Sequence, residues 1–138
     1  MNAWDHPLIK KGMIAQLATR RARIAAGETP LGWKVGLGAP ASLEKLRIAA
    51  PAVGCLMQSA LLPSGTTVSL KNYVRPVAEP EIAVRMARDL GGGATAAQAL
   101  AAIDSIRPAI ELADLDPVQE HDNLDVVFDG DIYQRHVL

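Results

Sequence analysis

Three glutamates stand in two apolar segments of the chain and have the right chemistry to bind a divalent cation together. Glu79 and Glu81 lie in the segment 75–86, and Glu111 lies in another with aliphatic neighbours on both sides. If both segments are strands, residues two apart project from the same face, so Glu79 and Glu81 point the same way and repel each other. An unpaired Glu111 would be costly to bury. One cation bound by all three removes both costs, and oxygen-only ligands favour Mg²⁺ or Mn²⁺ over zinc.

Each of these glutamates also has a plainer interpretation. Pairs with the pattern Glu-x-Glu are common on solvated strand faces, and Glu79 and Glu81 taken alone fit that description. Glu111 alone could be the partner of Arg75 or Arg107. Only the combination, two acidic residues in one predicted strand and a third in another, favours a metal site.

A lysine in a glycine-rich segment is the fourth residue with chemical potential. Lys34 stands between Trp33 and Val35 within the segment 31–38. Apolar neighbours can desolvate an ammonium group, which lowers its pKa and suits proton transfer or anion binding. The surrounding glycines allow a ligand to approach the backbone, but they form no phosphate-binding motif. The alternative is a surface lysine on an edge strand.

Composition excludes several classes of protein. The chain has 138 residues, 49% of them hydrophobic, and a net charge of −1, so it can form one core and offers no basic surface to nucleic acid. The single cysteine, Cys55, excludes an internal disulfide and is expected to pack as a small buried side chain. No apolar stretch is long enough to span a membrane, and the N-terminus has no secretory core. We therefore expect a cytoplasmic protein without membrane or nucleic-acid partners.

The elements that must position these residues alternate between helix and strand. The segment 8–27 predicts an amphipathic helix that ends near Gly27, with one apolar stripe formed by Leu8, Met13, Ile14, Leu17, Ile24 and Ala25. Further helices are predicted at 41–48 and at 95–103, where Thr95 is the expected N-cap. Strands are predicted at 31–38, 53–58, 66–70, 77–87, 107–114, 124–128 and 132–138.

The chain reads as one domain over residues 1–138. It has an N-terminal helical segment, 1–30, and a β-rich part, 31–138, that carries the proposed metal ligands. The sequence stops inside a strand-like apolar run, whereas domains usually end in polar segments. This predicts a domain that is truncated at its C-terminus.

Four motifs in order give the chain a family resemblance. They are Gly32–Leu37, Pro51–Gly54, Glu79–Ala83 and Pro108–Leu112. Together they resemble the 2-keto-4-pentenoate hydratase family of the fumarylacetoacetate hydrolase superfamily. The resemblance implies an α+β fold with an N-terminal helix and mixed strands curled into a β-roll, of which this chain holds only part. It also implies a Mg²⁺ or Mn²⁺ site at the mouth of the roll.

The resemblance also assigns roles to residues. Glu79, Glu81 and Glu111 match the metal-binding carboxylates of the family, and Lys34 matches its active-site lysine. The implied activity is a metal-dependent hydratase that adds water to a small 2-hydroxy-dienoic (2-oxo-enoic) acid through a metal-bound enolate, giving a 4-hydroxy-2-oxo acid. A homo-oligomer is expected.

Departures from the family pattern leave the substrate and the proton donor open. Ala52 and Val53 stand where some relatives carry an acidic residue, and an Asp-Ser-Arg stretch is replaced by 114–116. A vinylogous 2-oxo acid decarboxylase is therefore one alternative. Another is an acylpyruvate hydrolase, for which the candidate bases are His6, His121 and His136. From a different class, the chain could be a non-catalytic fragment or an oligomerisation module.

Overall fold

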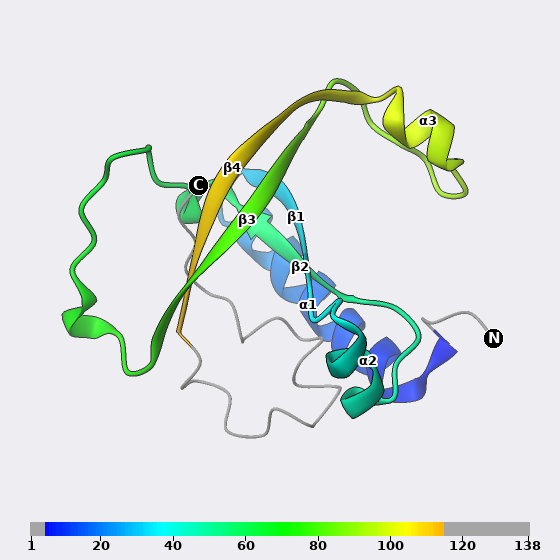
Figure 1. Ribbon diagram of the computed structural model, residues 1–138, viewed down its shortest axis with the longest axis horizontal. Coiled ribbons are helices and arrows are strands. Elements are labelled where there is room, and N and C mark those ends of the chain that lie inside the picture. Colours follow the sequence, from blue (N-terminus) through cyan, green and yellow to red (C-terminus); the bar gives the residue numbers. More distant parts are fainter. Residues whose placement is uncertain (1–4, 115–138) are drawn as a thin grey trace.

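The computed structural model describes residues 5–114 and combines three helices with four strands (Figure 1). The predicted α+β class is confirmed, while the β-roll stays a prediction, as do the strands at 124–128 and 132–138, which lie outside the described residues. The elements are α1 (Pro7–Ala25), β1 (Pro30–Gly36), α2 (Pro40–Leu46), β2 (Ala52–Met57), β3 (Pro76–Met86), α3 (Ala96–Leu100) and β4 (Ile103–Asp114), with short 3₁₀ turns at Gln58–Ala60 and Leu70–Asn72.

The strands form two antiparallel pairs. In the first, β1 pairs with β2, and Lys34 is the register partner of Gly54. In the second, β3 pairs with β4, and Glu79 is the register partner of Glu111. Figure 1 shows β3 and β4 as a long ribbon with α3 at its far end, and β1, β2 and α1 grouped beside its middle.

Local capping explains where α1 begins and ends. The ring nitrogen Nδ1 of His6 accepts a hydrogen bond from the backbone N–H of Leu8 at 3.3 Å, and Pro7 occupies the first turn, where a missing N–H costs nothing. The chain leaves the helix at Ala25 and turns through Gly27, whose φ of +95° favours glycine. None of the helices within residues 5–114 has the length and apolar character that crossing a bilayer requires.

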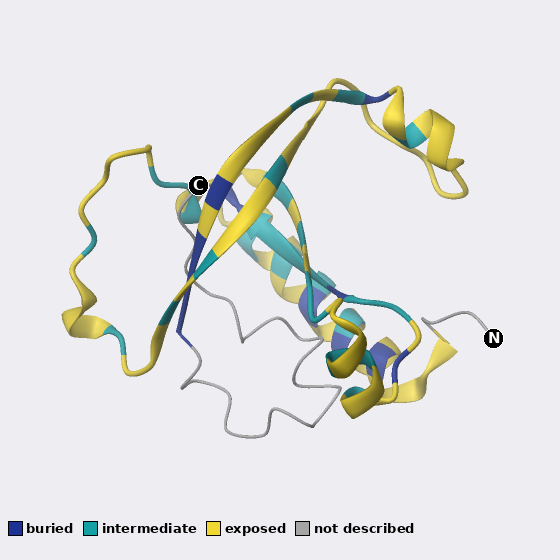
Figure 2. Cartoon of the chain, viewed as in Figure 1, coloured by how far each residue is buried: buried dark blue, intermediate teal, exposed yellow. Residues whose placement is uncertain are grey.

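The predicted apolar stripe of α1 is only partly right, because Met13 and Leu17 are half-buried and its other four side chains are exposed. Leu8 and Ile14 are exposed, whereas the buried positions are Ile9, Gly12 and Gln16 (Figure 2). The reason is the surface against which the helix packs. It contacts the backbone edge of β2, which offers N–H and C=O groups, so the polar side chain of Gln16 is buried there.

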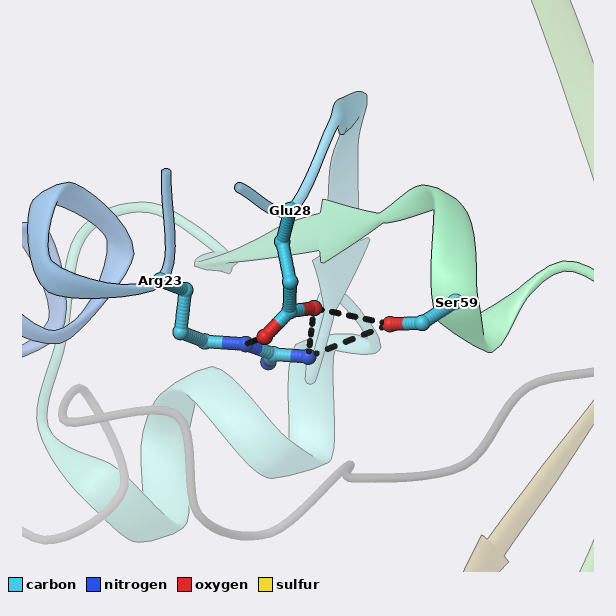
Figure 3. A network of polar contacts seen from close by, with 3 residues as sticks. All are labelled: Arg23, Glu28 and Ser59. Atoms are coloured by element: carbon cyan, nitrogen blue, oxygen red, sulfur yellow. Dashed lines mark hydrogen bonds and ion pairs between the residues drawn. The ribbon is translucent and has the colours of Figure 1, made fainter. Parts of the chain in front are cut away.

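A polar network joins the end of α1 to the loop before β1 and to the turn after β2 (Figure 3). Arg23 donates from Nε and from Nη2 to the two carboxylate oxygens of Glu28, each at 2.7 Å. The hydroxyl of Ser59 donates to Glu28 at 2.9 Å and accepts from Arg23 at 3.3 Å. The ion pair is partly exposed, at 42% for the arginine side chain and 33% for the glutamate.

The predicted strand at 66–70 is also wrong. The hydroxyl and the backbone N–H of Thr66 both bond to the carbonyl of Pro63, at 2.6 and 3.1 Å, so the β-branched run begins inside a turn. Within residues 5–114 no strand pairs with this segment. The turn chemistry therefore decides its conformation against its β propensity.

The helix predicted at 95–103 is shorter than expected, and the following strand is longer. Thr95 and Gln98 form the expected capping box, but α3 ends at Leu100 and β4 begins at Ile103. Ile103 is the register partner of Met86, so pairing along the ribbon takes residues that helix propensity alone assigns to α3. Tertiary pairing outweighs the local preference here.

The β3–β4 ribbon has two different faces because side chains alternate along a strand. Glu79, Glu81 and Glu111 share one face with the buried side chains of Ala109 and Ala113. Over 80–84 and 106–110 the opposite face is apolar and exposed, with Pro80, Ile82, Val84, Ile106, Pro108 and Ile110, whereas Leu112 and Asp114 at its other end are buried. The three carboxylates therefore lie on one face of the ribbon, beside small side chains that leave space around them.

Candidate metal centre

The structure brings the three predicted carboxylates together. Each of Glu79, Glu81 and Glu111 offers an oxygen, and these oxygens all lie within 4.8 Å of one another. The cluster arises from register, because Glu79 faces Glu111 directly across the ribbon and Glu81 follows two residues later on the same face. Glu111 is buried, Glu79 is half-buried and Glu81 is exposed, so the cluster opens to solvent on one side.

Lys34 reaches the cluster from the other sheet. Its Nζ donates a hydrogen bond to Oε1 of Glu111, and the two side chains are only 11% and 10% exposed. The neighbours of Lys34 along β1, Trp33 and Val35, point outward and are 49% and 65% exposed. This ion pair therefore links the β1–β2 pair to the β3–β4 ribbon at the place where the carboxylates converge.

Burial dominates the electrostatics of Lys34. Desolvation lowers the pKa of its ammonium group from 10.5 to about 8, although the hydrogen bond and charge of Glu111 and the charges of Glu79 and Glu81 act in the opposite direction. A lysine with such a pKa is partly neutral near physiological pH. It can therefore bind an anion or exchange a proton without a large energetic cost.

The carboxylate cluster fits a hard divalent cation. Around an octahedral Mg²⁺, with oxygens at about 2.1 Å from the ion, neighbouring ligand atoms lie about 3 Å apart and opposite ones about 4 Å. Oxygens already within 4.8 Å of one another need only small side-chain movements to reach that geometry. The donor set contains carboxylates alone, which suits Mg²⁺ and Mn²⁺ better than a thiolate-preferring metal.

Two buried polar residues that sequence reasoning missed hold the strands in place. Gln16 of α1 donates from Nε2 to the carbonyl of Val53 and accepts at Oε1 from the N–H of Cys55, both at 3.0 Å. These bonds fix β2 on both sides of Gly54. A glutamine in an amphipathic helix gives no signal of this role, since its partners are backbone groups of a distant strand.

Asp114 holds the β3–β4 ribbon in place through hydrogen bonds to the backbone. Its two carboxylate oxygens accept hydrogen bonds from the backbone N–H groups of Val74 and Arg75, at 3.1 and 2.8 Å. The end of β4 is thereby tied to the chain that enters β3, which fixes the pairing of Glu79 with Glu111. The sequence signal was present, because an acidic residue closing an apolar strand needs partners for its charge.

The remaining candidate residues contribute less. His6 caps α1 and lies on its exposed start, so the structure brings no carboxylate of the cluster to it. Cys55 is half-buried, which differs from the full burial expected. His121 and His136 lie outside the described residues.

Comparisons with known proteins find related hydratases and decarboxylases, although no protein-family profile matches the chain. A 2-hydroxyhexa-2,4-dienoate hydratase from Comamonas testosteroni is 36% identical over 97 residues, which cover 68% of this chain and 37% of the hydratase. A 4-oxalocrotonate decarboxylase from Pseudomonas sp. is 32% identical over 92 residues, covering 67% of this chain and 36% of the decarboxylase.

A solved structure gives the same result. The 4-oxalocrotonate decarboxylase from Pseudomonas putida G7, complexed with magnesium and adipate, superposes with a TM-score of 0.78 at 29% identity. The superposition covers 88% of this chain and 47% of that one. The chain therefore spans less than half the length of these relatives and shares their architecture over most of its own.

Proposed function

Since the chain belongs to the family that includes 2-keto-4-pentenoate hydratases, we propose that Glu79, Glu81 and Glu111 bind one divalent cation in an enzyme acting on a small 2-oxo or 2-hydroxy-dienoic acid. The observation that carries this proposal is the convergence of three carboxylate oxygens within 4.8 Å. The magnesium complex of the related decarboxylase supports it.

A bound Mg²⁺ or Mn²⁺ would act as a Lewis acid and as a template for the oxygens of the substrate. The chain itself supplies the other charge in the site. The ammonium group of Lys34 lies against Glu111, where it can bind the substrate carboxylate or move a proton. Its lowered pKa, about 8, suits either task at neutral pH.

The first candidate reaction is hydration. Water adds to the conjugated double bond of the substrate and gives a 4-hydroxy-2-oxo acid. The hydratases among the relatives, one of them 36% identical over 97 residues, support this reaction.

The second candidate is decarboxylation of a vinylogous 2-oxo acid. It has equal support, because a 4-oxalocrotonate decarboxylase is 32% identical over 92 residues and another superposes with a TM-score of 0.78. Product analysis separates the two reactions: release of CO₂ identifies the decarboxylase, and a hydrated product without CO₂ identifies the hydratase.

Calorimetric titration of the full chain with Mg²⁺, alone and with oxalate as an enolate mimic, tests the metal site directly. We expect saturable binding that oxalate strengthens. Replacing Glu79 by Gln removes one ligand and should weaken binding by about 100-fold or more, beyond the loss typical of changes around the ligands. The matched control is Glu44→Gln on the exposed surface of α2, which changes the net charge equally. Equal affinities for wild type and Glu79→Gln would refute the assignment.

A further inference from the structure

The stem of Lys34 lies across Gly54 on the neighbouring strand. The two residues are register partners in the β1–β2 pair. A Cβ atom added to Gly54 would lie 3.0 Å from Cγ of Lys34, 3.3 Å from Cδ and 3.9 Å from Cε. The first of these distances is shorter than an ordinary contact between carbon atoms, which is about 3.5 to 4.0 Å. Any side chain at position 54 would therefore press on the lysine stem close to its root.

Neither side of this contact can move away freely. The backbone on both sides of Gly54 is held by Gln16, through the carbonyl of Val53 and the N–H of Cys55. The far end of the lysine is held by Glu111. Relief of a clash at position 54 would thus come from a shift of the lysine stem by a few tenths of an ångström, which displaces Nζ from its contact with Glu111.

Position 54 needs glycine because of the adjacent side chain of Lys34, not because of its own backbone conformation. The φ angle of Gly54 is not among the positive values in the described part of the chain, so its backbone conformation is open to any residue. Gly32, in the partner strand, provides the contrast, because nothing lies within 4 Å of a Cβ added there and its φ is likewise not positive.

We propose that Gly54 is a positioning residue: its missing side chain forms the seat on which Lys34 lies, and this seat directs the ammonium group to Glu111. Gly54 acts through Lys34 and touches no reacting group itself. The inference rests on the proposed function only for its effect on metal binding, since the steric relation between the two residues exists without a metal.

A double-mutant cycle on the full chain tests the seat. Gly54→Ala should lower the melting temperature by about 5 °C or more, as overpacking of a held contact does. In a Lys34→Ala background the same substitution should have almost no effect, because alanine at position 34 has no Cγ to clash with. The control Gly32→Ala should change the melting temperature by less than about 2 °C.

A purely structural role for Gly54 gives a different pattern. In that case Gly54→Ala destabilises equally with lysine or alanine at position 34, and this result would overturn the proposal. If Gly54→Ala alone fails to fold, recovery of folded protein in the double variant supports the seat. A crystal structure of Gly54→Ala gives a direct readout, in which an unchanged contact between Lys34 and Glu111 would count against it.

Metal binding provides an independent readout. Removing a positive charge that touches Glu111 should tighten Mg²⁺ binding, and Lys34→Ala should lower Kd by roughly tenfold. Gly54→Ala should lower Kd in the same direction, and the double variant should match Lys34→Ala. If the wild-type chain binds no Mg²⁺, the proposed function fails, but the melting-temperature cycle still decides on Gly54.

Discussion

Two ion pairs of the described residues, Arg23–Glu28 and Lys34–Glu111, differ in how they are built. Arg23 and Glu28 are five residues apart, meet at the end of one helix, and stay partly exposed. Lys34 and Glu111 are 77 residues apart, come from different sheets, and are about one-tenth exposed. The first pair needs only local geometry, whereas the second exists only when both sheets are in place.

The two pairs also differ in what shifts the pKa values of their members. In the exposed pair the hydrogen bonds dominate, so the pKa of Glu28 is lowered and that of Arg23 is raised, and each partner favours the charge of the other. In the buried pair desolvation dominates, and the pKa of Lys34 falls in spite of its partner. The comparison teaches that the exposed pair is an ordinary surface contact, while the buried pair holds a charge at an energetic cost, as binding sites do.

The largest expected effect breaks the buried pair. Replacing Glu111 by Ala leaves the ammonium group of Lys34 buried beside fewer carboxylates. At pH 7 without Mg²⁺ this should lower the free energy of unfolding by about 3 kcal/mol, measured by urea denaturation. The matched substitution Glu28→Ala in the exposed pair should have a much smaller effect. Equal losses of unfolding free energy in the two variants would show that burial of the Lys34–Glu111 pair adds no stability beyond that of an exposed pair.

A second effect, at most as large as the first, is expected from alkaline pH. The pKa of Lys34 is about 8 in the folded chain and 10.5 ordinarily, so between these values the unfolded chain binds more protons. Stability should therefore rise as pH increases from 8 to 10.5, by up to about 3 kcal/mol relative to a Lys34→Met variant that lacks the group. Parallel pH profiles for wild type and Lys34→Met would contradict the lowered pKa.

The smallest effect concerns the exposed pair in acid. The pKa of Glu28 is lowered in the folded chain, so its contribution to stability is present above the ordinary value of 4.5 and is lost as pH falls through the folded value. The difference in melting temperature between wild type and Glu28→Gln should shrink over this acid range. It should also shrink at high salt, because exposed charges are screened. A difference that persists at low pH would point to packing as its source.

Part of the site could be predicted from residue spacing alone. Glu79 and Glu81 share a face because a strand repeats every two residues. Desolvation of Lys34 was also expected, but the neighbours on which that expectation rested, Trp33 and Val35, are exposed, and the lysine is buried against Glu111 instead. The position of Glu111 opposite Glu79 was open, since it depends on how the ribbon pairs and on Asp114 holding its end.

The fold was less predictable where its determinants are distant in sequence. The buried face of α1 follows from the backbone groups of β2 that Gln16 meets, and no pattern within the helix contains that information. The segment 66–70 is a different case, because the turn that decides its path begins at Pro63, only three residues before Thr66. The paired strands themselves were predicted, whereas the face of α1 that is buried and the register of the ribbon depend on partners distant in sequence.

The side-chain amide of Gln16 has a consequence for solubility. It makes the two hydrogen bonds that another strand would make to Val53 and Cys55. An uncovered strand edge is a template for pairing between chains and hence for aggregation. By occupying the middle of this edge, α1 ends the β1–β2 sheet at β2, so the helix that holds the strand beneath Lys34 also blocks the pairing of another chain at this edge.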